Sequence, residues 1–221
     1  GSLKAGSLTE ISNDNSAMRF DFEEQHIEGY AKLGIFLSKN GDRSVGNIFN
    51  VSRHKLGSLL NSLQGRNYQG QEDRIYYSSI YQIPEKNEHN LKLGISALGS
   101  HIQESLSNDN GDTFALDGWQ KTAGVFGEYT LEGDAISAVF GLRGDWHSVY
   151  GFYATPRVHL KWSLNKQHRF NAQGGMARRS SYFLSEHLHQ FINGRTLYID
   201  QSQLINQQWM PQEKAWNYGL S

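Results

Sequence analysis

The connections between the apolar stretches of this 221-residue chain alternate in length, and this alternation restricts the possible folds more than any other feature. We expect short polar turns at Lys39–Asp42, Pro84–Glu88, Glu132–Asp134 and Leu164–Gln167. Between them we expect long polar loops at His54–Asp73, Ser105–Gly118, His147–Tyr150 and Ser180–Gln212. An antiparallel sheet with tight turns at one rim and long loops at the other is typical of outer-membrane barrels.

The stretches between these connections alternate apolar and polar residues with the period of a β-strand. In the segment 152–162, for example, Ala154, Val158 and Leu160 alternate with Arg157, His159 and Lys161. Runs of about ten residues match the 9–11 that a tilted strand needs to cross a bilayer, whereas strands of soluble proteins are mostly about five or six residues long. We therefore expect an all-β fold, an antiparallel up-and-down meander that forms part of a transmembrane β-barrel.

The composition agrees with a barrel and excludes several classes of function. Only 38% of the residues are hydrophobic, and no run approaches the roughly 18 apolar residues of a spanning helix. Aromatic residues cluster near the expected strand ends, as in two interfacial bands. They are Tyr81, Tyr129 and Trp162 at one rim and Trp146, Tyr150, Phe152 and Tyr153 at the other. The formal net charge of -1 gives no basic surplus for nucleic acid. The absence of cysteine excludes disulfides, thiolate metal sites and a cysteine nucleophile.

Several segments together resemble the barrel of TonB-dependent outer-membrane receptors. They are the segment 140–147 (FGLRGDWH), then Tyr150-Gly151, then the segment 155–162 (TPRVHLKW) and the segment 171–180 (NAQGGMARRS). The segment 211–219 (PQEKAWNYG) resembles the start of a further strand, and the segment 65–70 (GRNYQG) before a Tyr-rich strand also fits. The resemblance extends from about Gly29 to the C-terminus, and its most specific part is Phe140–Arg179.

This resemblance implies a 22-stranded barrel whose lumen is closed by an N-terminal plug domain. It also implies partners: the lipid of the outer membrane, the protein's own plug, TonB and a small-molecule ligand of the siderophore, cobalamin or glycan class. We expect residues 29–221 to form about eight strands plus the start of another, as an interior part of such a barrel. Residues 1–28 stay unassigned, as a polar segment or barrel loop. Short turns would face the periplasm, and long loops the outside.

Charged residues on the polar face of the expected strands are candidates for contacts with the plug or the transported ligand. They are Arg143, Asp145, Arg157, His159 and Lys161. Ordinary solvation of a polar lumen by these residues is an alternative, because charges cost little there. Arg178 and Arg179 lie near the outer rim, where they could meet an anionic substrate or surface lipopolysaccharide.

Other clusters carry weaker signals, and from them we predict neither catalysis nor a metal or other cofactor. Glu186, His187 and His189 are possible ligands, but loop histidines usually bind no metal. The segment 108–112 (NDNGD) lacks the alternating acids and distal glutamate of a calcium loop. Asp145, His147 and Ser148 are the residue types of a hydrolase triad, but Ser148 would point away from the other two. The segment 65–70 lacks the Gly-Lys-Ser/Thr ending of a P-loop.

Two other architectures stay open on the sequence alone. A complete eight-stranded membrane barrel could close with a filled interior and act as an anchor or adhesin. A soluble, lipocalin-like barrel would turn the apolar face inward and bind a ligand there.

Overall fold

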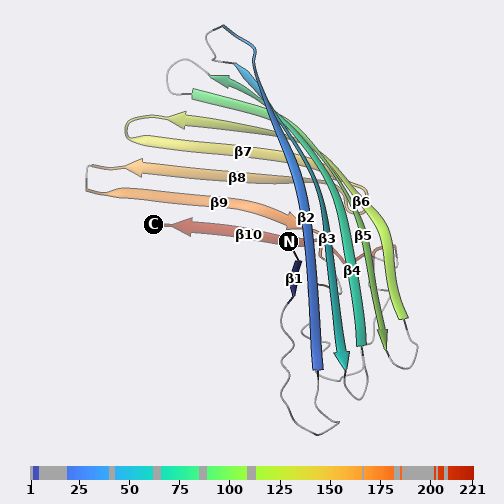
Figure 1. Ribbon diagram of the computed structural model, residues 1–221. Helices are drawn as coiled ribbons and strands as arrows, with labels where there is room; N and C mark the ends of the chain where they lie inside the picture. Colours follow the sequence, from blue (N-terminus) through green and yellow to red (C-terminus); the bar gives the residue numbers. More distant parts are fainter. Residues whose placement is uncertain are drawn as a thin grey trace.

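The structure is a computed structural model that describes residues 2–4, 19–39, 43–61, 66–84, 89–108, 113–165, 167–181, 185, 202, 204–206 and 209–221. These residues form strands joined in one sheet (Figure 1). The strands are β1 (Ser2–Lys4), β2 (Arg19–Phe36), β3 (Ser44–Asn61), β4 (Arg66–Pro84), β5 (His89–Asn108), β6 (Thr113–Glu132), β7 (Ile136–His147), β8 (Gly151–Ser163), β9 (Arg169–Arg179) and β10 (Glu213–Leu220).

Every strand pairs antiparallel with the next strand along the chain, in the order β1 to β10. The expected all-β meander is therefore confirmed. The sheet is open, because β10 pairs only with β9 among the described strands. Neither a closed eight-stranded barrel nor a lipocalin-like barrel has this topology. The expected segment boundary at Gly29 falls inside β2, which begins at Arg19. No helix in the described ranges is long and apolar enough to cross a membrane.

The expected long loop at His147–Tyr150 is wrong, because β7 ends at His147, β8 begins at Gly151 and a tight turn joins them. The expected long loops at His54–Asp73 and Ser105–Gly118 are wrong as well. In both places the strands continue, so that β3 ends at Asn61, β4 begins at Arg66, β5 ends at Asn108 and β6 begins at Thr113. The register is unbroken through this region, for example at the pairs His54↔Glu72 and Gln103↔Asp117. Backbone hydrogen bonds do not depend on side-chain polarity, so the ladder continues after the apolar alternation has ended.

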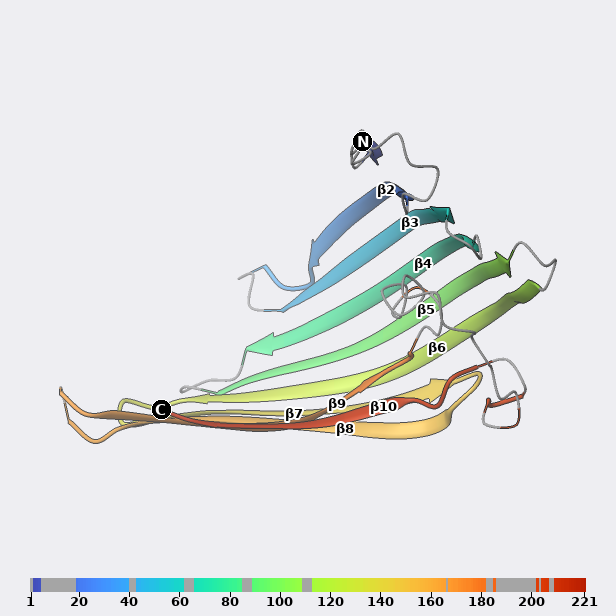
Figure 2. The same cartoon turned by 90° about the horizontal axis from the view of Figure 1, so that it is seen from below.

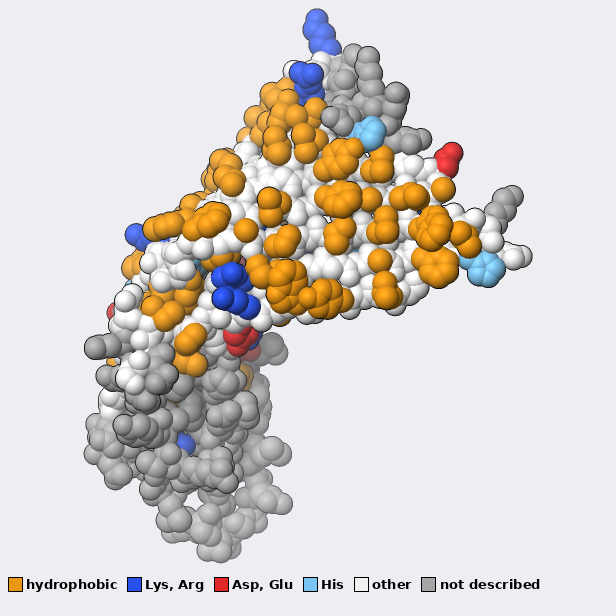
Figure 3. Space-filling model, turned by 180° about the vertical axis from the view of Figure 1, so that it is seen from behind, with side chains coloured by type: hydrophobic (Ala, Val, Ile, Leu, Met, Phe, Trp, Pro, Cys, Tyr) orange, Lys and Arg blue, Asp and Glu red, His pale blue; other side chains and the backbone are white. Residues whose placement is uncertain are grey.

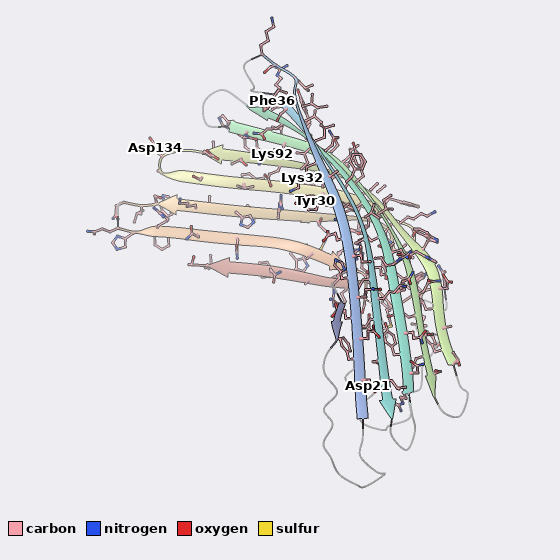
Figure 4. All side chains as sticks on the ribbon, viewed as in Figure 1. Asp21, Tyr30, Lys32, Phe36, Lys92 and Asp134 are labelled. Carbon is pink, nitrogen blue, oxygen red and sulfur yellow. The ribbon has the colours of Figure 1, made fainter. Side chains whose placement is uncertain are left out.

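The strands fall into a long group and a short group. β2 to β6 contain 18 to 20 residues each, whereas β7, β8 and β9 contain 12, 13 and 11. All of them reach the end of the sheet that carries the tight turns, such as Gly133–Ala135, which we name the short-turn end. At the opposite end, named the extended end, only β2 to β6 continue. Figure 4 labels Asp21 and Phe36 toward the two ends of β2, Lys92 on β5 and Asp134 in the turn after β6.

One face of the sheet, named here the outer face, is apolar and exposed. Exposed hydrophobic side chains occur on each strand from β2 to β10 and form the patch seen in Figure 3, and Ile95, Val125 and Leu142 are 53%, 63% and 61% exposed. On β5 the apolar run extends from Leu91 to Gly99, about 27 Å at 3.4 Å per residue. This length is close to the apolar band of about 25 Å on outer-membrane barrels. An exposed apolar surface of this extent requires a lipid or protein environment.

Beyond this apolar band the outer face becomes polar and is held by pairs between neighbouring strands. Arg53 on β3 forms an ion pair with Asp73 on β4, in which Nη2 donates to Oδ2 at 3.2 Å. His101 Nε2 lies 2.7 Å from Asp117 Oδ1, and Gln103 donates to the other oxygen of that carboxylate at 3.1 Å. These hydrogen bonds lower the pKa of Asp117. Such pairs indicate that the extended end of the sheet faces water.

The opposite face, named the inner face, carries the polar residues and part of the β9–β10 connection. The strands follow an arc (Figure 2). On the inner face Trp209 is buried against Ile102 and Leu116, with Ile205 and Val149 at the edge of this apolar cluster. Tyr150 donates to the Met210 carbonyl at 3.0 Å. The β9–β10 connection therefore packs on the inner face of β5 and β6, in the region where these longer strands extend past the ends of β7 and β8.

Two aromatic residues expected in the outer rim band are on the inner face instead. Tyr150 contacts Met210 in the β9–β10 connection, and Tyr153 lines an inner cavity. The tight β7–β8 turn causes this placement of Tyr150, because Gly151 adopts a φ of 71°, which glycine tolerates without strain. Trp146 and Phe152 remain exposed on the outer face, as expected for an interfacial position.

Candidate polar site on the inner face

The register brings the inner-face residues of β5, β6 and β7 into one row. Ser96 pairs with Gly124, and Gly124 pairs with Asp145. Arg143, two residues along β7, turns back to Asp145 and donates from Nε at 2.7 Å and from Nη2 at 2.6 Å. Nη2 also donates to Ser96 at 2.7 Å. The carboxylate is buried, with 5% of its side chain exposed, and is fully engaged by this bidentate pair.

Gly124, which has no side chain, leaves space for this ion pair on the inner face of β6. A Cβ added at Gly124 would lie 2.1 Å from Asp145 Oδ1 and 2.6 Å from Arg143 Nη2. The pair therefore lies flat over the backbone of β6. On its other side the Arg143 guanidinium sits 5.6 Å from the centre of the Phe126 ring, an arrangement that favours a cation.

Arg157, His159 and Lys161 share the inner face with Arg143 but do not join its network. Arg157 forms an ion pair with Glu128, which also accepts from Lys92 at 3.3 Å. His159 and Lys161 are exposed and lie nearer the short-turn end. The structure thus separates the five candidate residues into a pair whose carboxylate is buried, an arginine in an exposed ion pair and two exposed side chains. Whether any of them contacts a plug or a ligand stays a prediction.

Arg178 and Arg179 lie beside the buried pair rather than only at a rim. The β8–β9 ladder ends at the pair Arg157↔Gly175, so the last residues of β9 separate from β8. Arg178 lies over the Tyr153 ring, 5.0 Å from its centre, and donates to Gln212 at 3.2 Å. Arg179 pairs with Glu213 at 2.9 Å.

A cavity of about 530 Å³ joins these groups. Both Arg143 and Asp145 line it, as do Arg178 and Arg179 from β9. Further polar lining residues, which are Ser100, Gln120, Thr122, His147 and Thr155, come from β5 to β8. The sequence reasoning above did not single out Ser100 or Gln120. The sequence signal that could have found them is the alternation that identified Arg143. Both residues lie on the inner face of strands whose outer face is apolar.

The residues of a possible triad are engaged in other bonds. Asp145 is bonded to Arg143, and His147 Nδ1 accepts from the Val149 amide at 3.1 Å. Ser148 is exposed, and its hydroxyl oxygen accepts from the Lys121 amide at 2.9 Å. As expected, Ser148 lies apart from the other two residues. The described part of the chain holds no group of three or more His, Asp or Glu residues suited to a metal ion. Glu186, His187, His189 and residues 109–112 lie outside the described residues.

Comparison with solved structures identifies this architecture. The chain is similar to the ferric citrate transporter FecA in its unliganded form, with a TM-score of 0.55, 9% identity, and coverage of 73% of this chain and 28% of that one. It is also similar to the RagAB peptide importer, with a TM-score of 0.50, 11% identity, and coverage of 92% and 28%. The siderophore receptor PirA from Pseudomonas aeruginosa matches with a TM-score of 0.36, 17% identity, and coverage of 82% and 40%.

These similarities concern the fold, since the identities are low and the chain spans less than half the length of each of these structures. No protein-family model matches the sequence. No curated protein matches it either. The two structures with a TM-score of 0.50 or more are named as a transporter and an importer. The expected resemblance is confirmed at the level of the fold: the chain has the architecture of part of the β-barrel wall of TonB-dependent outer-membrane receptors.

Proposed function

We propose that this chain is part of the wall of an outer-membrane transporter that takes up a scarce ligand by TonB-dependent transport. The observation that carries the proposal is the opposite polarity of the two faces of the same strands. The outer face exposes an apolar band about as wide as a bilayer core, and the inner face holds buried charges and a polar cavity. A wall of this kind separates lipid from an aqueous passage.

The orientation follows from the two different ends of the sheet. Outer-membrane barrels have short periplasmic turns and longer segments at the cell surface. The short-turn end would therefore face the periplasm, and the extended end of β2 to β6 would project outside. The cavity would then lie toward the outer half of the passage. The plug domain and TonB are proposed partners through the same resemblance, and the inner face of this chain is where a plug would fit.

The cargo is proposed to be a small molecule of the siderophore, cobalamin or glycan class. Ferric citrate and peptides are the cargoes in the names of the two structures with the higher TM-scores. A single barrel architecture thus serves chemically different cargoes, and the residues of the passage must provide the selectivity. We propose no catalytic role for the chain.

Uptake measurements in living cells test this proposal. A strain that lacks the gene and a complemented strain are compared for uptake of radiolabelled ferric siderophores, cobalamin and oligosaccharides, with and without a protonophore. We expect the deletion to abolish uptake of one class, complementation to restore it, and the protonophore to block it. Uptake that is unaffected by the deletion, or that persists with the protonophore, would contradict TonB-dependent transport. Fractionation of the complemented cells should place the protein in the outer membrane.

A further inference from the structure

We propose that the inner-face cavity binds the carboxylate or phosphate group of an anionic small ligand, with Arg178 and Gln120 as the recognising residues. The inference deepens the proposed transport function, on which it rests for the identity of the cargo. The binding step itself can be measured without transport.

The charges around the cavity leave one arginine available. Four arginines line it, but Arg143 is paired with Asp145, Arg74 with Glu72 at 2.8 Å, and Arg179 with Glu213. Arg178 makes its described contacts to neutral groups, the Gln212 side-chain oxygen and the Tyr153 ring. Among the described residues it has no carboxylate partner. An anion in the cavity would therefore neutralise Arg178 without breaking an existing ion pair.

Gln120 and Arg178 each place on the cavity wall a donor that has no acceptor within the described part of the chain. Gln120 is buried, with 5% of its surface exposed, and its Nε2 donates to no described acceptor. Arg178 Nε is likewise buried without an acceptor there. A buried donor without an acceptor is costly, and native structures usually provide the acceptor through water or a ligand. Ser100, which is 3% exposed, adds a neutral hydroxyl to the same wall.

The chemistry of the wall favours an oxyanion over a cation or a neutral sugar. Asp145 is the carboxylate that lines the cavity, and Arg143 already occupies both of its oxygens. The lining therefore offers donors in excess of acceptors. A guanidinium binds the planar oxygens of a carboxylate or the oxygens of a phosphate through paired N–H groups. The volume of about 530 Å³ lies within the range of pockets for small molecules.

Direct binding to the intact, purified protein tests the inference. Isothermal titration at low ionic strength would use sodium citrate and inorganic phosphate as the two probes, which separates a carboxylate source from a phosphate source. Glycerol serves as the uncharged probe. The variants are Arg178→Gln, Gln120→Met and Gln120→Glu. Arg169→Gln is the matched control, because Arg169 lies on the same strand at the short-turn end, away from the cavity.

We expect at least one oxyanion to bind, and glycerol not to bind. Arg178→Gln should weaken binding about tenfold or more, since hydrogen bonds to charged groups are the strong ones. Gln120→Met should weaken it less, and Gln120→Glu should abolish it by adding a negative charge at the same place. Arg169→Gln should bind as the wild type does. Heat-modifiable migration in gels verifies that each variant is folded.

Failure of this inference can be told apart from failure of the proposed function. No binding of either probe, or equal losses in Arg178→Gln and Arg169→Gln, would overturn the anion site. Normal uptake of the cargo by Arg178→Gln and Gln120→Glu would also overturn it, while transport itself would stand. If oxyanions bind as expected but the deletion strain loses no uptake, the transport proposal fails and the anion site remains.

Discussion

An arginine in the middle of the apolar band should destabilise the protein far more than an arginine beyond the band. Val125 and Ala115 provide the comparison, because both are exposed on the outer face of β6. They lie about 34 Å apart along the strand, at 3.4 Å per residue. If lipid covers the band, Val125→Arg places a charge near the bilayer midplane, at a cost of about 2–4 kcal/mol. Ala115→Arg reaches water and should cost about 0–1 kcal/mol.

The difference between the two variants is the measured quantity. A gap of about 2 kcal/mol corresponds to roughly thirtyfold in the folding equilibrium constant. The intact protein and the two variants would be unfolded by denaturant from lipid vesicles, with tryptophan fluorescence as the signal. If Val125 faced water, its replacement would cost within about 0.5 kcal/mol, like most surface changes. Equal midpoints for the two variants would refute a lipid-covered outer face.

Three further outcomes follow from described contacts. Trp209→Ala should remove the apolar contact with Ile102 and release the β9–β10 connection from the inner face. For a buried tryptophan the loss of folding free energy is about 3–5 kcal/mol. Increased protease cleavage between Arg179 and Glu213 in intact cells would report the release. Asp145→Asn leaves Arg143, which is partly exposed, without its counter-charge, so a destabilisation on the order of 1–2 kcal/mol is expected in the same vesicle assay after allowance for solvent screening. Folding lowers the pKa of Asp117, so this carboxylate stabilises the folded state above the unfolded-state pKa of about 4. The stabilisation is lost as the pH falls through the lower pKa of the folded state. Asp117→Asn should therefore reduce the loss of unfolding free energy on the acid side of a plot against pH.

The sequence predicted the strands wherever apolar and polar residues alternate. On β8, Val158 and Leu160 lie on the apolar outer face, and His159 and Lys161 lie on the polar inner face. From that pattern the fold class and the polarity of both faces could be predicted. The two alternative barrels were removed because no pairing closes the described sheet, and closure is a feature that no local pattern contains.

The parts that the sequence could not predict depend on contacts between distant segments. β3 and β5 continue past His54 and Glu104 because their backbones pair with a neighbour, and backbone pairing leaves no side-chain signature in water. Trp209 reaches Ile102 across the inner face through tertiary packing alone. Arg178 reaches Tyr153 because the β8–β9 ladder ends at Gly175. The cavity combines these distant placements, so local reasoning found Arg143, Asp145, Arg178 and Arg179 but neither Arg74 nor the grouping of these residues.

The continuation of β2 to β6 beyond the apolar band makes the described wall taller on one side than on the other. From Gly99 to Asn108 the strand β5 extends about 31 Å further, at 3.4 Å per residue. Ser100 and Gln120 lie at the base of this wall, level with the end of the band. On the side of β7 and β8 the described wall is lower, and Trp209 packs there against Ile102 and Leu116. If the chain lines a passage, as we propose, a ligand that approaches over β7 and β8 crosses less of the described wall than one that approaches over β2 to β6. We therefore expect Tyr150 and Trp209 to be among the first described side chains that such a ligand meets.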